Sequence, residues 1–273
     1  DMLGKMATNE PEKYATFWAQ FGPVLKEGPS EDHSNREKIA KLFRFASSTS
    51  ESAAPEVSLS DYIGRMKEGQ DKIYYLTGDS HSVINNSPYL EVFRKHGIEV
   101  LLMSDRIDEW MMGYLSEFDG KSFQDIARGE LDLSKITGEE PKADDADGSE
   151  GGDKEQGALL QRLKSLLDGK VEEVRTTTRL TSSPACLVVG ANDMGEQMRK
   201  IMAAAGQPVP EAKPILEINT EHPLVNKLDS EADEERAKVL ASLLFDQAAL
   251  SAGRPLENPA QFVQELNRLM FEA

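Results

Sequence analysis

The stretch that decides the fold runs from Ile98 to Phe118 and reads IEVLLMSDRIDEWMMGYLSEF. Its first six residues, 98–103, form an apolar run of strand length between polar flanks, which is typical of a strand buried on both faces in a parallel sheet. Ser104 or Asp105 then offers an N-cap, and apolar residues return at helical intervals. The stretch therefore predicts a strand followed by a helix whose apolar face carries Ile107, Trp110, Met111, Tyr114, Leu115 and Phe118.

The segments before this stretch complete a strand–helix–strand unit. Residues 73–76 read as a strand, and residues 88–96 read as a helix. A unit of this kind places its two strands parallel in one sheet, with helices covering the faces of that sheet. Further upstream, aromatic residues recur at helical spacing between 14 and 21. Residues 1–136 are therefore predicted to form helices followed by a small three-layer α/β/α subdomain.

Residues 137–156, TGEEPKADDADGSEGGDKEQ, contain no large apolar residue and carry an acidic excess. They predict a flexible acidic linker and a domain boundary. Residues 157–273 then alternate between helical and strand patterns and end in two amphipathic helices. This part is predicted to be an α+β domain with a terminal helical hairpin, so the whole chain has an α/β first part and is α+β overall. Its predicted strands are 171–180, 185–189 and 215–218.

The bulk properties narrow the class of function. The net charge of −17 disfavours nucleic acid and anionic membranes as partners. The single cysteine, Cys186, excludes an internal disulfide and fits a reducing, cytoplasmic compartment. No apolar run approaches the length needed to cross a membrane.

No pattern in the chain indicates catalysis. The phosphate-binding patterns GxxxxGK[ST] and GxGxxG are absent, and no serine lies in GxSxG. The four histidines are scattered, without partners at the spacing of metal ligands. We therefore predict no catalytic, metal-binding or cofactor-binding residue in this chain.

A methionine-rich helix is predicted from Met194 to Ala205, preceded by a capping-box pattern at Asp193 and Glu196. Its apolar face carries Met194, Met198, Ile201, Met202 and Ala205. Such a face usually packs into a core. Methionine, however, is flexible and adapts to varied partners, so an exposed binding face is an equally open interpretation. Trp110 has the same two interpretations, because it lies at the border of its helical stripe.

The terminal hairpin also has two interpretations. Its helices could pack on their own domain, or two hairpins could form a four-helix bundle between two copies of the chain. We favour the homodimer, because the domain offers little else for both apolar stripes to cover. The predicted dimerisation residues are Leu240, Leu243, Leu244, Ala248, Phe262, Leu266, Leu269 and Met270.

Five segments, spread over most of the chain, resemble the ninety-kilodalton heat-shock chaperone family in its bacterial form. They are FGPVLKEGPSED (21–32), KLFRFASS (41–48), YIGRMKEGQDKIYYLTG (62–78), FRKHGIEVLLMSDRIDEW (93–110) and the methionine-rich helix with AAAGQ (203–207). The resemblance implies that residues 1–136 are the later part of the family's middle domain and that 157–273 are its dimerisation domain. It also implies that the ATP-binding domain, which uses ATP and magnesium, and the middle-domain loop whose arginine assists hydrolysis lie outside this chain.

The resemblance further implies a surface for non-native client proteins near the junction of the two domains. The matching residues are Glu109, Trp110, Gly113, Met194, Ile201 and Met202, and Met198 shares the same helical face. The chain ends in LMFEA and lacks the acidic pentapeptide with which eukaryotic relatives recruit TPR co-chaperones, so no TPR partner is expected. The predicted function is a homodimeric chaperone fragment that binds unfolded clients. The alternative is a dimerisation scaffold and lever, with clients bound mainly elsewhere.

Overall fold

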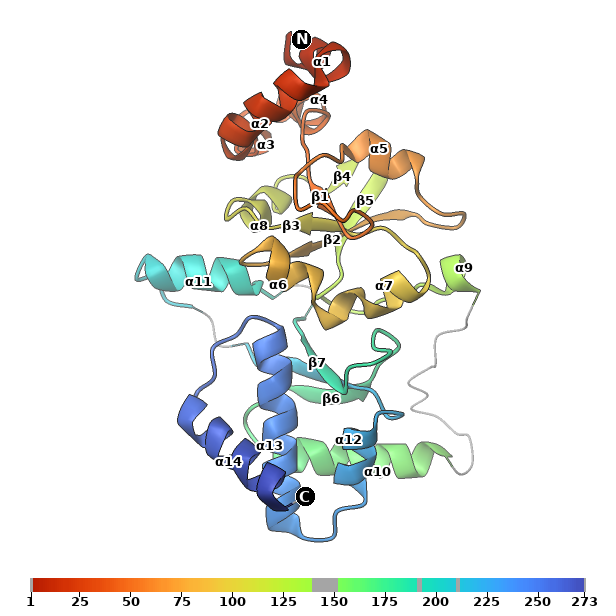
Figure 1. Cartoon of the computed structure of the whole chain (residues 1–273), viewed down its shortest axis with the longest axis vertical. Helices are drawn as coiled ribbons and strands as arrows, with labels where there is room; N and C mark the ends of the chain where they lie inside the picture. Colours follow the sequence, from red (N-terminus) through yellow and green to blue (C-terminus); the bar gives the residue numbers. More distant parts are fainter. Residues whose placement is uncertain (1, 139–151, 191–192, 210–211, 273) are drawn as a thin grey trace.

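The computed structural model describes residues 2–138, 152–190, 193–209 and 212–272. Helices at the N-terminal end lead into a five-stranded sheet, a three-stranded sheet follows it, and two long helices lie at the opposite end (Figure 1). The predicted mixed α/β class, α+β overall, is confirmed. Among the described helices, none is both long and apolar enough to serve as a membrane span.

The first layer of the molecule is helical. Tyr14 and Trp18 of α2 bury their rings, and Trp18 packs near Phe43 with 6.1 Å between ring centroids. These contacts attach the N-terminal helices to the subdomain that follows. The helices are α1 (Met2–Asn9), α2 (Pro11–Leu25), α3 (Gly28–Glu31) and α4 (Arg36–Ala40).

The five-stranded sheet has the order β1-β3-β2-β5-β4. Strand β2 runs parallel to β3, with Tyr75 opposite Leu101, so the predicted parallel unit is confirmed. Strand β2 is also parallel to β5, whereas the edge strands β1 and β4 are antiparallel to their neighbours. The strands are β1 (Ala46–Ser47), β2 (Lys72–Thr77), β3 (Leu101–Met103), β4 (Glu117–Phe118) and β5 (Lys121–Asp125).

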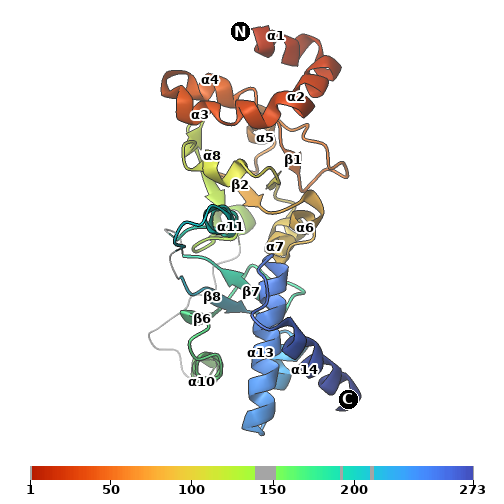
Figure 2. The same cartoon turned by 90° about the vertical axis from the view of Figure 1, so that its left-hand side faces the viewer.

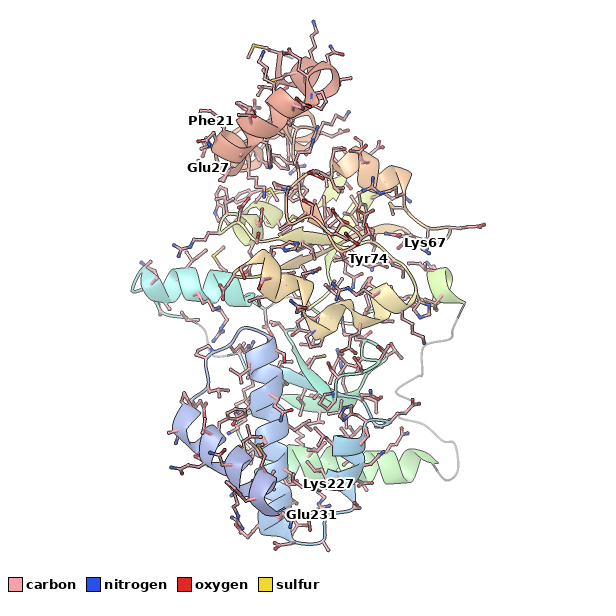
Figure 3. All side chains as sticks on the ribbon, viewed as in Figure 1. Phe21, Glu27, Lys67, Tyr74, Lys227 and Glu231 are labelled. Atoms are coloured by element: carbon pink, nitrogen blue, oxygen red, sulfur yellow. The ribbon has the colours of Figure 1, made fainter. Side chains whose placement is uncertain are left out.

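Helices cover both faces of this sheet, as the three-layer prediction requires. Tyr74 and Leu76 of β2 point into a cluster with Phe93, while Ile73 points into a second cluster with Trp18. This alternation follows from the two-residue period of a strand. Figure 3 labels Tyr74 within the packed side chains of the sheet. The covering helices are α5 (Leu59–Gly64) and α8 (Asp108–Met112) on one face, and α6 (His81–Asn85), η2 (Pro88–Leu90) and α7 (Glu91–Lys95) on the other.

The helix predicted to reach Phe118 is shorter than its apolar pattern indicated. Helix α8 ends at Met112, and Phe118 lies in β4. Asp119 and Gly120 have φ values of 50° and 71°, and they turn the chain back into β5. An Asp-Gly pair is a strong hairpin signal, and here it overrides the helical spacing of the buried residues.

The C-terminal part has a three-stranded sheet in the order β6-β8-β7. Strand β8 is parallel to β6 and antiparallel to β7. The predicted strand positions are confirmed, although β6 is shorter than the range 171–180. The elements are β6 (Glu173–Thr176), β7 (Ala185–Val188) and β8 (Ile215–Ile218), with α10 (Gly152–Leu166), α11 (Glu196–Ala204), α12 (Pro223–Asp229), α13 (Glu234–Ser251) and α14 (Pro259–Glu272).

Most of the predicted linker 137–156 lies outside the described residues. Helix α9 (Ser134–Thr137) precedes it, and α10 begins at Gly152, so residues 152–156 are helical and the linker was predicted too long at its end. The reason is that Leu159 and Leu163 are buried and fix the helix, which then continues toward its N-terminus.

Backbone pairing joins the two parts directly. The Gly129 N–H donates to the carbonyl of Val189 at 2.9 Å. Arg179, which is 2% exposed, donates from Nη1 to the carbonyl of Ile126 at 2.5 Å and from Nε to Glu217 at 2.8 Å. The sequence left the angle between the domains open. The structure sets it with this pairing and with the hydrogen bonds that buried Arg179, which is paired with Glu217 in its own part, donates across the junction to the carbonyls of Ile126 and Gly129.

Candidate functional site

Two predicted site segments, far apart in the sequence, lie side by side. Helix α8 belongs to the five-stranded layer, and α11 extends from the three-stranded part to reach it (Figures 1 and 2). We call the exposed and half-buried side chains of these two helices and their flanks the α8/α11 surface. It comprises Trp110, Gly113, Tyr114, Met194, Met198, Ile201 and Met202.

Helix α8 is held on its inner side by a buried ion pair between Lys26 and Asp108. Met111 and Asp108 are buried, and the Lys26 ammonium lies 2.6 Å from Asp108 and 2.7 Å from Asp105. Burial raises the pKa of Asp108, while the charge of Lys26 acts in the opposite direction. With these residues facing inward, the opposite face of the helix is left toward solvent.

That outer face carries an aromatic pair. The rings of Trp110 and Tyr114 lie 4.7 Å apart between centroids, which is within the range of favourable aromatic packing. Trp110 is half-buried, Tyr114 is 37% exposed, and Gly113 is exposed. Trp110 belongs to none of the three buried apolar clusters of the described residues.

Helix α11 contributes the methionine-rich face. Met198 and Met202 are half-buried, Ile201 is 38% exposed, and Met194 lies half-buried just before the helix. None of these four belongs to a buried apolar cluster. The methionine-rich face therefore lies outside the buried apolar clusters of the described residues. Ala205 follows the helix and is exposed.

Glu109 lies in this region but faces the protein. Its side chain is 8% exposed, and its Oε1 is 2.7 Å from Nη2 of Arg128. Its Oε2 accepts a hydrogen bond from the Met198 N–H at 2.9 Å. The predicted capping box at Asp193 is wrong, because Gly195 is the N-cap residue and has no side chain to offer. The carboxylate of Glu109, from another helix, binds an N–H of the first turn instead.

Arg128 is a site residue that sequence analysis missed. Its Nη1 donates to the Asp193 carbonyl at 2.9 Å, and its Nε lies 3.0 Å from Asp125. Burial raises the pKa of Asp125, and the charge of Arg128 opposes that shift. Arg128 follows β5, a strand the sequence did not reveal, so no pattern placed it beside the methionine-rich helix.

The predicted dimerisation residues separate into two groups. On α13, Leu243, Leu244 and Ala248 are buried; Leu244 and Ala248 belong to the apolar cluster of their own domain, and Leu240 packs against that cluster. On α14, Phe262, Leu266 and Leu269 are half-buried, whereas Met270 is 70% exposed. Val263 and Phe271, which the prediction did not include, are also exposed on α14. Exposed apolar side chains therefore lie on α14, which packs against α13 (Figure 2).

Nothing in the described residues resembles a metal centre, since no group of three or more His, Cys, Asp or Glu could hold an ion. A small cavity of about 60 Å³ lies between the end of β2 and the end of α13. Its lining includes Asp79, Lys200 and Gly253. Pockets that bind drug-sized ligands span roughly 300–1,000 Å³, so this cavity is too small for a nucleotide.

Comparison with known protein families identifies the family of this chain. The family model described as Hsp90 protein matches residues 1–273, the whole of the chain. The match confirms, at the level of the family, the resemblance found in the five sequence segments, and it supports a chaperone role. The chain belongs to the Hsp90 family of molecular chaperones.

Proposed function

We propose that this chain binds non-native polypeptides on the α8/α11 surface as part of a homodimeric bacterial chaperone. One observation carries the proposal. Two apolar faces from different domains, the Trp110–Tyr114 pair and the methionine-rich face of α11, meet outside every buried cluster of the described structure. Exposed apolar patches of this kind mark interaction sites in soluble proteins.

The chemistry of the surface suits an unfolded client. Methionine side chains adjust their shape, and aromatic rings supply rigid apolar area, so segments of varied sequence find contacts. The net charge of −17 keeps such a protein dispersed and attracts basic segments of a client. In this proposal the chain itself performs no chemistry and works in the cytoplasm. In this proposal the chain itself binds no ATP or magnesium.

A homodimer would present the surface twice. Helix α14 lies on one side of the C-terminal end (Figure 2), and its exposed apolar residues offer a surface on which a second copy can pack about a two-fold axis. Two weak contacts with one client chain then act at raised effective concentration. The alternative function is a dimerisation scaffold and lever, with clients bound mainly in other domains.

A binding titration tests the client proposal. A labelled, permanently unfolded polypeptide is titrated with the chain and with a Met194→Ser, Ile201→Ser, Met202→Ser variant. We expect at least about tenfold weaker binding by the variant, because about 1.5–3 kcal/mol of apolar burial is lost per large side chain. Circular dichroism checks that the variant stays folded. Equal binding by both proteins would show that clients do not bind the α8/α11 surface. If neither protein binds the polypeptide, the scaffold function is the one that remains.

Sedimentation tests the dimer. Val263→Asp with Met270→Asp places two charges on the exposed face of α14, and we expect the dimer to dissociate because burying unpaired charge is costly. Val83→Asp, at an equally solvent-exposed valine on α6, is the matched control. A chain that sediments as a monomer before any substitution would contradict the homodimer.

A further inference from the structure

Helix α11 is held in place by polar contacts more than by apolar burial. It has nine residues, fewer than the roughly 12–15 that an isolated helix needs to be even marginally stable in water. Its apolar residues belong to none of the buried clusters. Interactions other than core packing must therefore keep it ordered and in place beside α8.

The strongest of these interactions converge on its first turn. Glu109 uses one carboxylate oxygen for Arg128 and the other for the Met198 N–H, and Arg128 also binds the Asp193 carbonyl. We call Glu109, Arg128 and these two backbone groups the Glu109 cluster. With both oxygens engaged and 8% exposure, the carboxylate of Glu109 faces the helix and not the solvent.

The backbone approaches this cluster very closely at Gly195. A Cβ added to Gly195 would lie 2.1 Å from both Glu109 Oε1 and Arg128 Nη2. Real Cβ atoms do not approach other atoms this closely, so only glycine lets the first turn of α11 reach the ion pair. Gly195 is thus part of the same arrangement, because its backbone packs directly against the ion pair of Glu109 and Arg128.

A second contact lies further along the helix. The Lys200 ammonium is 2.6 Å from Asp79 and donates to the Gly253 carbonyl at 3.0 Å. Both side chains are partly exposed, and such pairs contribute little to stability. Of these two described contacts, the Glu109 cluster is the more buried one and contributes more to the attachment of α11.

We propose that Glu109 and Arg128 are positioning residues of the client surface, which act on clients through α11 and not by touching them. The proposal rests on the proposed function of the α8/α11 surface. It replaces direct contact, the role that the family resemblance implied for Glu109. In the described structure the cluster orders the methionine-rich face beside Trp110 while leaving that face open to solvent.

The test combines amide hydrogen exchange with client affinity, using the full chain. The variants are Glu109→Gln, Gly195→Ala, and Trp110→Ser as a surface comparator. Gly64→Ala is the control, because a Cβ there meets no atom within 4 Å. We expect Glu109→Gln and Gly195→Ala each to speed exchange across α11 by about tenfold, as the loss of a charge-assisted hydrogen bond predicts, and to weaken client binding. Trp110→Ser should weaken binding while exchange in α11 stays unchanged.

A double variant separates a shared mechanism from two independent ones. Because both substitutions disrupt one cluster, Glu109→Gln with Gly195→Ala should be about as defective as either alone. Additive losses would overturn the proposal. Weaker client binding by Glu109→Gln with normal exchange in α11 would also overturn it, because that result would indicate that Glu109 contacts the client directly. If the unsubstituted chain binds no client, the proposed function fails. The positioning role is judged separately, by hydrogen exchange: unchanged exchange in α11 of the Glu109→Gln variant would refute it.

Discussion

Helices α11 and α13 both carry an apolar face, and the protein uses the two faces differently. Helix α13 packs on β7 and α10, where Leu244 and Ala248 join the largest cluster of the C-terminal part. Helix α11 keeps Ile201 38% exposed and is attached through Glu109 and Lys200. Apolar spacing alone therefore does not reveal whether a face is buried.

Residue type separates the two helices better than spacing does. Leucine and alanine on α13 have few rotamers and fill a fixed core. The face of α11 relies on methionine, which adapts to irregular surfaces. The N-terminal caps differ as well. Asp233, the residue directly before α13, caps that helix with its own side chain, whereas the first turn of α11 is capped by the carboxylate of Glu109 from α8.

The largest expected effect tests this difference in burial. Leu244→Ala should lower the free energy of unfolding by about 3 kcal/mol, because it leaves a cavity in a packed cluster. Met202→Ala, on the half-buried face of α11, should cost less than about 1 kcal/mol. Urea unfolding followed by circular dichroism measures both. Equal losses would break the comparison between the two helices.

A smaller effect is expected from the cap of α13. The Asp233 carboxylate accepts hydrogen bonds from Glu235 N–H at 3.0 Å and Arg236 N–H at 3.4 Å. Asp233→Ala should cost about 1 kcal/mol of unfolding free energy, and Asp233→Asn should restore most of it. Neither change should alter hydrogen exchange in α11. Faster exchange in α11 would show that the two helices are not independently held.

The smallest effect concerns pH at the domain junction. Burial alone would raise the pKa of Glu91, but hydrogen bonds from the N–H groups of Ser182, Thr181 and Ser183 and from the Ser183 hydroxyl outweigh it and hold that pKa below its ordinary value. A lowered folded-state pKa stabilises the junction above the unfolded pKa of about 4.3, and this contribution is lost as pH falls through the folded pKa.

Glu91→Gln should therefore lower the melting temperature at neutral pH, and the difference from the unsubstituted chain should shrink as the pH falls below about 4. Calorimetry over that range measures it. A difference that persists undiminished in acid would assign the effect to packing and not to the charge of Glu91.

Much of the fold could be predicted from local patterns. The buried run of β3, the parallel pairing with β2 and the three layers follow from apolar period and strand length, and the structure confirms them. The hairpin of β4 and β5 was missed, although its Asp119-Gly120 turn was visible in the sequence. Two-residue strands such as β4 carry too little pattern to be recognised.

The candidate site was predictable only in part. Helical spacing identified Trp110 and Met198 as candidate surface residues, and the family resemblance assigned both helices to one client surface. The partnership of Glu109 with Arg128 and Gly195 was not predictable, because Arg128 follows a strand that the sequence did not reveal and Gly195 reaches the pair only after the two parts of the chain pack together. A lone glycine before a helix gives no sign that a distant carboxylate occupies the space beside it.

The two tryptophans of the chain allow the most direct test of the central claim, which is that clients bind the α8/α11 surface. Trp18→Phe leaves Trp110 as the only tryptophan, and Trp110→Phe leaves the buried Trp18. A tryptophan-free unfolded polypeptide is added to each variant while emission is recorded. We expect a blue shift from Trp110 and none from Trp18, because only Trp110 loses water on binding. Saturable binding with no change in Trp110 emission would contradict the account.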